Sequence, residues 1–197
     1  MMNMLINSVP DSLHIAGAEY KIKTDFRIWL KFEMLLSENK ENAENTLADI
    51  KKLVFCERQP PMLADEEAVN QILWFYRCGK PPKKGSHQSQ KEIFSYEYDD
   101  GYICAAFMQQ YHIDLNSAKL HWWKFHALML SLSDSTEFVK IMSYRSIEIN
   151  SKMTAAQKSF YQKMKKQYKL PLKEKVQKQI LSIEDALING ETIDNLL

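Results

Sequence analysis

Histidine is the residue type in this chain best suited to bind a transition metal, and two of the five histidines lie close together. His121 and His126 are five residues apart in an apolar stretch that is typical of a helix. At about 100° per residue their side chains point about 140° apart, whereas histidines that share a zinc ion on one helix are four residues apart. His14, His87 and His112 are scattered along the chain. We therefore expect no metal site.

Carboxylates are the second group that could do chemistry, as a general acid and base pair. Glu97, Asp99, Asp100 and Asp114 lie near one another in the sequence. Asp99 and Asp100 stand just before an expected helix, where a carboxylate caps free backbone amides, and capping explains them without catalysis. The chain lacks the glycine motifs that bind nucleotide phosphates, and no serine or cysteine lies in a nucleophile-elbow context. We expect a protein that is not an enzyme and has no cofactor.

Lysine is concentrated in residues 152–178, which hold nine lysines and one acidic residue, Glu174. On a helical wheel one side of this segment is basic and the opposite side is apolar. The basic side holds Lys158, Lys165, Lys166 and Lys169, and the apolar side holds Phe160, Tyr161, Met164 and Tyr168. Three interpretations stay open: a solvated helix face, a surface for a protein partner or neighbouring subunit, and a nucleic-acid site. Residues 33–67, which carry nine acids against four bases, are the reason for the second interpretation. An acidic surface of this kind on a neighbouring subunit or partner would attract the lysines.

The adjacent residues Trp122 and Trp123 are the fourth notable feature. On a helix they point about 100° apart, so both are buried only if the helix is surrounded by protein. We expect core packing, and an exposed tryptophan that anchors a partner is the alternative.

The composition narrows the fold class and the cellular location of the protein that carries these residues. Of 197 residues, five are glycine and six are proline, roughly half the usual share, which disfavours β-rich and disordered classes. The net charge of +1 gives no general reason to expect nucleic acid or an anionic membrane as a partner. The three cysteines form no CxxC motif, and the start of the chain lacks the features of a signal peptide. These observations favour a cytoplasmic protein.

Hydrophobic spacing predicts a β-hairpin over residues 12–23 that turns near Gly17, followed by helices. Four helices are expected at about 25–37, 42–56, 117–132 and 135–145. A further helix opens at Asp65, Glu66 and Glu67, whose charges favour the positive end of the helix dipole, and it stops at Gly79. One more is capped by Asp99 or Asp100, with Ile103, Ala106, Phe107 and Gln110 along one side. Another begins at a capping box from Thr154 to Gln157 and ends near Tyr168, and a last helix covers about 173–189. Residues 80–92 contain no large apolar side chain and are predicted to form a mobile loop.

The resulting prediction is a mainly α protein: a single compact helical domain of about seven helices with a short N-terminal β-hairpin. Residues 1–171 form the body, and residues 172–197 form a C-terminal helix and tail after a joint at Pro171. The apolar stripe of this last part is the expected partner-binding surface, at Ile180, Ile183, Leu187, Ile193, Leu196 and Leu197.

Several of these segments resemble the bacteriophage gene product fifteen family of siphophages and of prophages in Gram-positive bacteria. The resemblance covers about residues 9–172 and rests on DFR at 25–27, ILWFYRCGK at 72–80 and YDDGYICAAFMQQYHIDL at 98–115. It rests further on LHWWKFHALMLSL at 120–132, FVKIMSYRSIEI at 138–149 and LP at 170–171.

The resemblance implies a role in building a phage tail. Members of the family are encoded in the tail module between tail-tube and tape-measure genes, a position that implies a tail assembly chaperone. Such a chaperone binds the long, helical tape-measure protein until tail-tube subunits polymerise around it, acts in the host cytoplasm and is absent from the finished virion. The implied partner is the tape-measure protein or another tail protein, and a homo-oligomer is compatible with the family. The alternative is a minor structural tail component retained in the virion.

Overall fold

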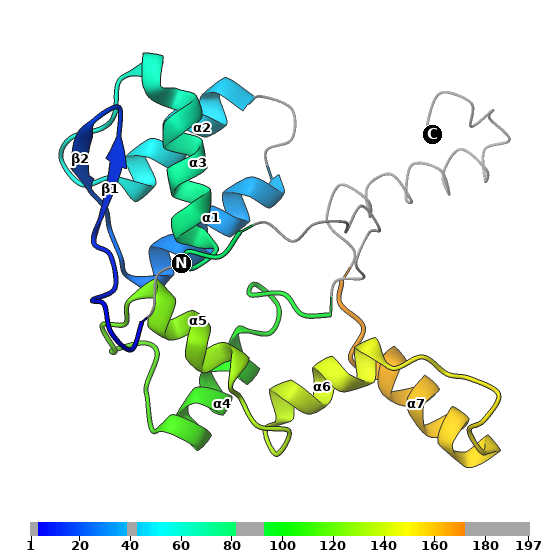
Figure 1. Cartoon of the computed structure of the whole chain (residues 1–197). Helices are drawn as coiled ribbons and strands as arrows, with labels where there is room; N and C mark the ends of the chain where they lie inside the picture. The colour runs from blue at the N-terminus through cyan, green and yellow to red at the C-terminus, as the bar shows by residue number, and fades with distance from the viewer. Residues whose placement is uncertain (1–3, 39–42, 82–92, 172–197) are drawn as a thin grey trace, which may run out of the picture. The chain divides into compact units, whose positions relative to one another are not determined.

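The computed structural model describes residues 4–38, 43–81 and 93–171 (Figure 1). Within them the chain forms a two-stranded sheet, a short 3-10 helix and seven α-helices, so the expected mainly α fold with an N-terminal hairpin is confirmed. None of these helices combines the length and the apolar character needed to cross a membrane. The expected mobile loop at 80–92, apart from its first two residues, and the expected helix at 173–189 lie outside the described residues.

The strands and the first helices follow the predicted order. Their bounds are β1 Ser12–Ile15, β2 Ala18–Lys21, α1 Phe26–Glu38, α2 Ala43–Val54, the 3-10 helix η1 Met62–Ala64 and α3 Asp65–Tyr76. The remaining helices are α4 Asp100–Tyr111, α5 Trp122–Leu130, α6 Glu137–Ser146 and α7 Ala155–Gln167.

The residues group into two compact units, each made of two separate stretches of chain. Unit 1 comprises Met1–Gln90 and Ile103–Thr136, and unit 2 comprises Lys91–Tyr102 and Glu137–Leu197, in both cases as far as they are described. The predicted separation of residues 1–171 from 172–197 stays a prediction, since the second part is not described.

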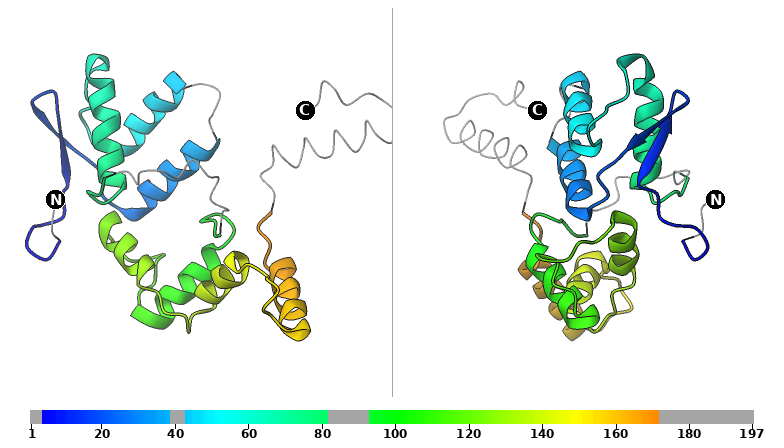
Figure 2. Two further views of the ribbon diagram at one scale, coloured as in Figure 1. Left: turned by 45° about the vertical axis from the view of Figure 1, so that its right-hand side comes forward. Right: turned by 90° about the vertical axis from the view of Figure 1, so that its left-hand side faces the viewer.

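The hairpin turns where the sequence predicts. Ala16 and Gly17 both have positive φ values, 48° and 74°, as a two-residue hairpin turn requires. Leu13, Ile15 and Tyr20 lie on the buried side of the hairpin. The hairpin packs against α3, and α1 lies beside α2 (Figure 2).

Large aromatic rings from α1, α3, α4 and α5 form the core of unit 1. Trp29 and Phe75 pack with their ring centroids 4.5 Å apart, and Phe26 stacks on Phe125 at 4.6 Å. Such ring pairs add to the free energy gained by burying their area. The fully buried members of this core are Trp29, Phe32, Phe75, Trp122, Trp123, Phe107 and Phe125.

The two adjacent tryptophans cap the end of α3. The indole Nε1 of Trp122 donates to the carbonyl of Tyr76, and that of Trp123 donates to the carbonyl of Phe75, both at 2.8 Å. These carbonyls belong to the last turn of a helix, where no backbone amide within the helix can reach them. Both rings are buried, so the expectation of core packing is confirmed.

Gly79 reverses the chain after α3 with φ +72°, as its predicted role as a helix stop requires. Its amide donates to the carbonyl of Trp74 at 2.9 Å. A Cβ atom here would lie 3.1 Å from Cη2 of Trp123, so the same position also needs a residue without a side chain.

The helix predicted from residue 117 begins only at Trp122, and the earlier start is wrong. Asp114 accepts from the backbone amide of Asn116 and from the hydroxyl of Ser117, which holds a turn before the helix. The chain then runs extended beside residues 24–26, where the amide of Trp122 donates to the carbonyl of Thr24 at 2.8 Å. The periodic apolar pattern could not reveal this pairing, since its partner is about 95 residues away.

Unit 2 contains α6 and α7, and its apolar core is small. Within the described residues of this unit, the buried apolar side chains are Phe138 and Ile141, both on α6. The predicted capping box opens α7: Thr154 accepts from the amide of Gln157, whose side chain accepts from the amide of Thr154. No residue of α7 is buried.

Candidate functional site

The histidines considered for metal binding serve the fold. Nδ1 of His121 accepts from the amide of Trp123, and Nε2 lies 3.0 Å from the carbonyl of Pro10, so both ring nitrogens are engaged with the backbone. This pattern fits the neutral ring with its proton on Nε2. Burial lowers the pKa of both His121 and His126 below its ordinary value. Over the parts of the chain that the structure describes, no group of three His, Cys, Asp or Glu residues could hold a metal ion.

The carboxylate of Asp99 forms a buried ion pair, a role that the expectation of a simple helix cap missed. Oδ2 accepts from Nη1 of Arg145 at 2.6 Å and Oδ1 accepts from Nη2 at 2.9 Å. Oδ2 also accepts from the amide of Ser95 at 2.9 Å, and the side chain of Asp99 is 1% exposed. Two charge-assisted bonds in parallel, satisfied by a further amide, are the arrangement in which a buried pair is stable.

Arg145 joins three segments of unit 2. Besides Asp99, its guanidinium donates to the carbonyl of Ile93 at 3.1 Å and to the carbonyl of Tyr168, at the end of α7, at 2.5 Å. Lys165 of α7 in turn donates to the carbonyl of Arg145 at 3.2 Å. These bonds explain how α7 is held although none of its residues is buried.

The other acids considered for catalysis have local roles. Asp100 accepts from the amide of Gly101 at 2.7 Å, at the start of α4. The hydrogen bond from the amide of Asn116, together with that from Ser117, lowers the pKa of Asp114. Glu97 is exposed. The structure therefore gives Asp100 and Asp114 local hydrogen bonds, and it pairs Asp99 with a base, not with a second acid.

One exposed surface lies on α7 and just beyond its end, and we call Phe160, Lys163, Lys166 and Lys169 the basic face. Phe160 is 47% exposed, with its ring edge against Tyr144 at a centroid distance of 6.0 Å. The three lysines are exposed, whereas Lys158 and Lys165, which the helical wheel placed with them, are half-buried. Lys165 leaves this surface because it bonds to Arg145, a contact that a wheel for one helix cannot include.

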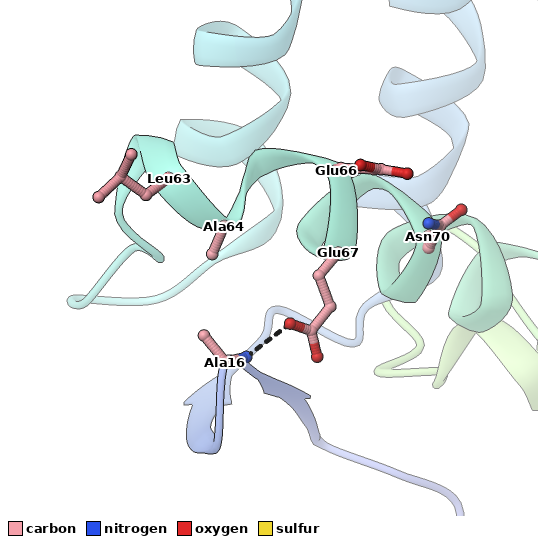
Figure 3. Close-up of a pocket in the computed structure, with 6 residues that line it drawn as sticks. All are labelled: Ala16, Leu63, Ala64, Glu66, Glu67 and Asn70. Carbon is pink, nitrogen blue, oxygen red and sulfur yellow. Dashed lines mark hydrogen bonds between the residues drawn. The ribbon is translucent and has the colours of Figure 1, made fainter.

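A second exposed surface lies at the start of α3, and we call Met62, Leu63, Glu66 and Glu67 the acidic face. It borders a hollow of about 340 Å³ lined by Ala16, Leu63, Ala64, Glu66, Glu67 and Asn70 (Figure 3). Oε2 of Glu67 accepts from the amide of Ala16 in the hairpin turn at 2.9 Å. Leu63 is fully exposed and Met62 is 84% exposed. Sequence reasoning counted these acids within the acidic stretch 33–67 and in the helix dipole, but it did not place them on one surface with Met62 and Leu63.

The predicted partner-binding residues lie outside the described residues. These are Ile180, Ile183, Leu187, Ile193, Leu196 and Leu197. They stay a prediction.

A comparison with protein families gives one match, the model described as bacteriophage Gp15 protein, over residues 5–170. The chain belongs to this family. The match covers most of the chain and confirms the resemblance expected from the sequence. Neither the curated proteins nor the solved structures compared with the chain contain a match.

Residues in the strings that resemble this family tie distant parts of the chain together. Arg27, in DFR, donates to both carboxylate oxygens of Asp25 and to the carbonyls of Leu115, Asn116 and Ala118. Trp122 and Trp123, in LHWW, cap α3, and Arg145, in SYRSIEI, joins the segments of unit 2. The strings thus contain bonds that build the fold, while the two exposed faces lie largely outside them.

Proposed function

We propose that this member of the bacteriophage Gp15 family is a non-enzymatic tail assembly protein that binds the tape-measure protein before the tail tube polymerises. It acts in the cytoplasm of the bacterial host and leaves before the virion is complete. Membership of the family is the observation that carries the proposal, and the position that the resemblance implies for the gene supplies the link to the tail.

The character of the described surfaces supports a binding role. Several side chains that the sequence offered for chemistry or for anchoring a partner instead form hydrogen bonds or an ion pair within the chain. They are Asp99, Asp114, His121, Trp122 and Trp123. The exposed faces instead combine apolar and charged side chains, a combination suited to a protein partner.

The tape-measure surface that we propose is the predicted stripe Ile180, Ile183, Leu187, Ile193, Leu196 and Leu197. A long helical partner exposes apolar positions at spacings of three and four residues, which match those of such a stripe. Burial of this stripe against the tape-measure protein would keep both apolar surfaces from water.

Co-expression of the full chain with the tape-measure protein of the same phage tests the proposal. We expect the tape-measure protein to move into the soluble fraction and to elute with this chain in size-exclusion chromatography. A variant with Ile183→Glu and Leu187→Glu is expected to lose the complex. A matched variant with Ser182→Glu and Asn189→Glu, opposite the stripe on the predicted helix, is expected to keep it.

Unchanged solubility of the tape-measure protein together with no complex would overturn the proposal. Mass spectrometry of purified particles supplies a second test, since a chaperone is expected to be absent from them. Its presence at a fixed stoichiometry would instead favour the alternative of a minor structural tail component.

A further inference from the structure

We propose that the basic face of α7 in one copy of this chain binds the acidic face at the start of α3 in a second copy. This contact is separate from the proposed tape-measure surface and uses different residues. Each face lies within one unit, the basic face in unit 2 and the acidic face in unit 1.

The basic face is suited to a partner of opposite charge. Residues 152–171 hold six lysines and no acidic residue. Lys163 and Lys166 are exposed on α7, and Phe160 at the edge of the face is 47% exposed. An aromatic ring beside lysines gives such a face an apolar anchor in addition to its charge.

The acidic face offers the matching chemistry. Asp65, Glu66 and Glu67 open α3 in succession, and Glu66 and Glu67 are exposed. Directly before them Met62 and Leu63 expose nearly their whole side chains. Leu63 also borders the open hollow, whose lining includes Ala64 and Asn70, so an apolar ring such as that of Phe160 can lie against it.

The anchoring of both faces favours association without rearrangement. Oε2 of Glu67 is held by the amide of Ala16, which fixes the start of α3 against the hairpin turn. On the other side, Arg145 and the capping box hold both ends of α7. Pre-ordered surfaces lose less conformational entropy when they bind.

Size and symmetry define the kind of assembly. α7 has 13 residues and is about 20 Å long, so one helix face gives a small, weak interface that forms only at higher protein concentration. Because the two faces differ, the contact runs head to tail and produces closed rings or open chains of copies.

Sedimentation velocity of the full chain over a series of protein and salt concentrations tests the proposal. We expect self-association that weakens as salt rises, since the charges on both faces are solvent-exposed. Variants with Lys163→Glu plus Lys166→Glu, or with Glu66→Lys, are expected to associate about tenfold more weakly, because attraction turns into repulsion. A matched variant with Lys119→Glu and Lys124→Glu, at exposed positions that belong to neither face, is expected to associate like the wild type.

Mixing distinguishes this contact from other modes of association. The Lys163→Glu, Lys166→Glu variant and the Glu66→Lys variant are expected to associate with each other more tightly than either does with itself. All substituted side chains are exposed, and circular dichroism checks that each variant is folded. A wild type that is monomeric at every concentration would overturn the proposal. Two further results would overturn it. One is self-association of the charge-reversed variants that is as strong as that of the wild type, and the other is a mixture of the two variants that associates no more tightly than each variant alone.

Discussion

In unit 1, aromatic side chains from four helices fill the core, whereas in unit 2 a buried ion pair between Asp99 and Arg145 joins the segments. The first arrangement shares its stability among many contacts, each worth a small amount. The second concentrates stability in two charges that are favourable only together. The comparison shows that one chain can hold its helices by two physical means.

The difference bears on which helix is left for a partner. A helix whose apolar face fills a core, such as α5, has little left to offer a second protein. α7 is held by bonds to its ends and to Lys165, so its outer side can carry exposed lysines and a half-exposed ring. We infer that polar anchoring leaves the basic face available for binding.

The largest expected effect comes from breaking the ion pair. Arg145→Ala leaves Asp99 charged and buried without its partner, which should cost about 3–5 kcal/mol of the stability of unit 2. Denaturant unfolding measures the loss, and hydrogen exchange locates it in α6 and α7. The double variant Asp99→Leu, Arg145→Met should be more stable than the single variant, because it removes both charges. A loss below about 1 kcal/mol for Arg145→Ala would contradict the contrast between the units.

A smaller loss is expected from the aromatic core. Trp123→Phe removes the hydrogen bond to the carbonyl of Phe75 and part of a fully buried ring, at a cost of about 2 kcal/mol. Trp74→Phe is the control, since Trp74 packs edge-on against Trp123 but is only half-buried, and it should cost less. Equal losses in thermal unfolding would show that the core does not depend on the indole bond.

The capping box of α7 supplies a third test. Thr154→Ala removes the side chain that accepts from the amide of Gln157 and should cost about 1 kcal/mol. A helix without buried residues relies more on its ends, so faster hydrogen exchange should be confined to the first turns of α7. Ser159→Ala, at an exposed position inside the same helix, should leave the exchange rates almost unchanged.

The smallest effect is a pH dependence that arises in unit 1. Because burial lowers the pKa of His121 and His126 in the folded chain, the unfolded chain binds protons first as the pH falls below about 6.5. The stability contributed by the neutral rings is therefore complete above about pH 7.5 and declines below pH 6.5. Unfolding free energies from pH 8 to pH 5.5 measure this decline.

Substitutions assign the pH dependence to its source. Replacing both half-buried histidines, His121→Gln and His126→Gln, should flatten the decline. His14→Gln, at an exposed position on β1, should keep it. If the free energy of unfolding of the double variant still declines below pH 6.5, a titrating group other than these two histidines causes the decline.

The elements that the sequence predicts well are those set by near neighbours. The capping box at Thr154, the hairpin turn at Gly17 and the acids that open α3 each act over a few residues, so their types and spacing suffice. The helical class followed in the same way from apolar spacing and from the scarcity of glycine and proline.

The features that the sequence misses depend on residues far apart in the chain. Asp99 and Arg145 are separated by 46 residues, and neither carries a local sign of the other. Likewise, α5 begins late because residues before it pair with Thr24 and Phe26, about 95 residues earlier. A spacing rule sees only one segment at a time and cannot weigh such bonds.

The sequence by itself determined the class of this protein, the order of its helices and its family, because local propensity and motif content are written along the chain. Tertiary structure alone decided which charges are buried and which are exposed. Lys165 and Lys166 are adjacent in sequence, yet one bonds to Arg145 and the other belongs to the basic face. The reason is physical: desolvation and hydrogen bonding depend on the atoms that surround a side chain in space.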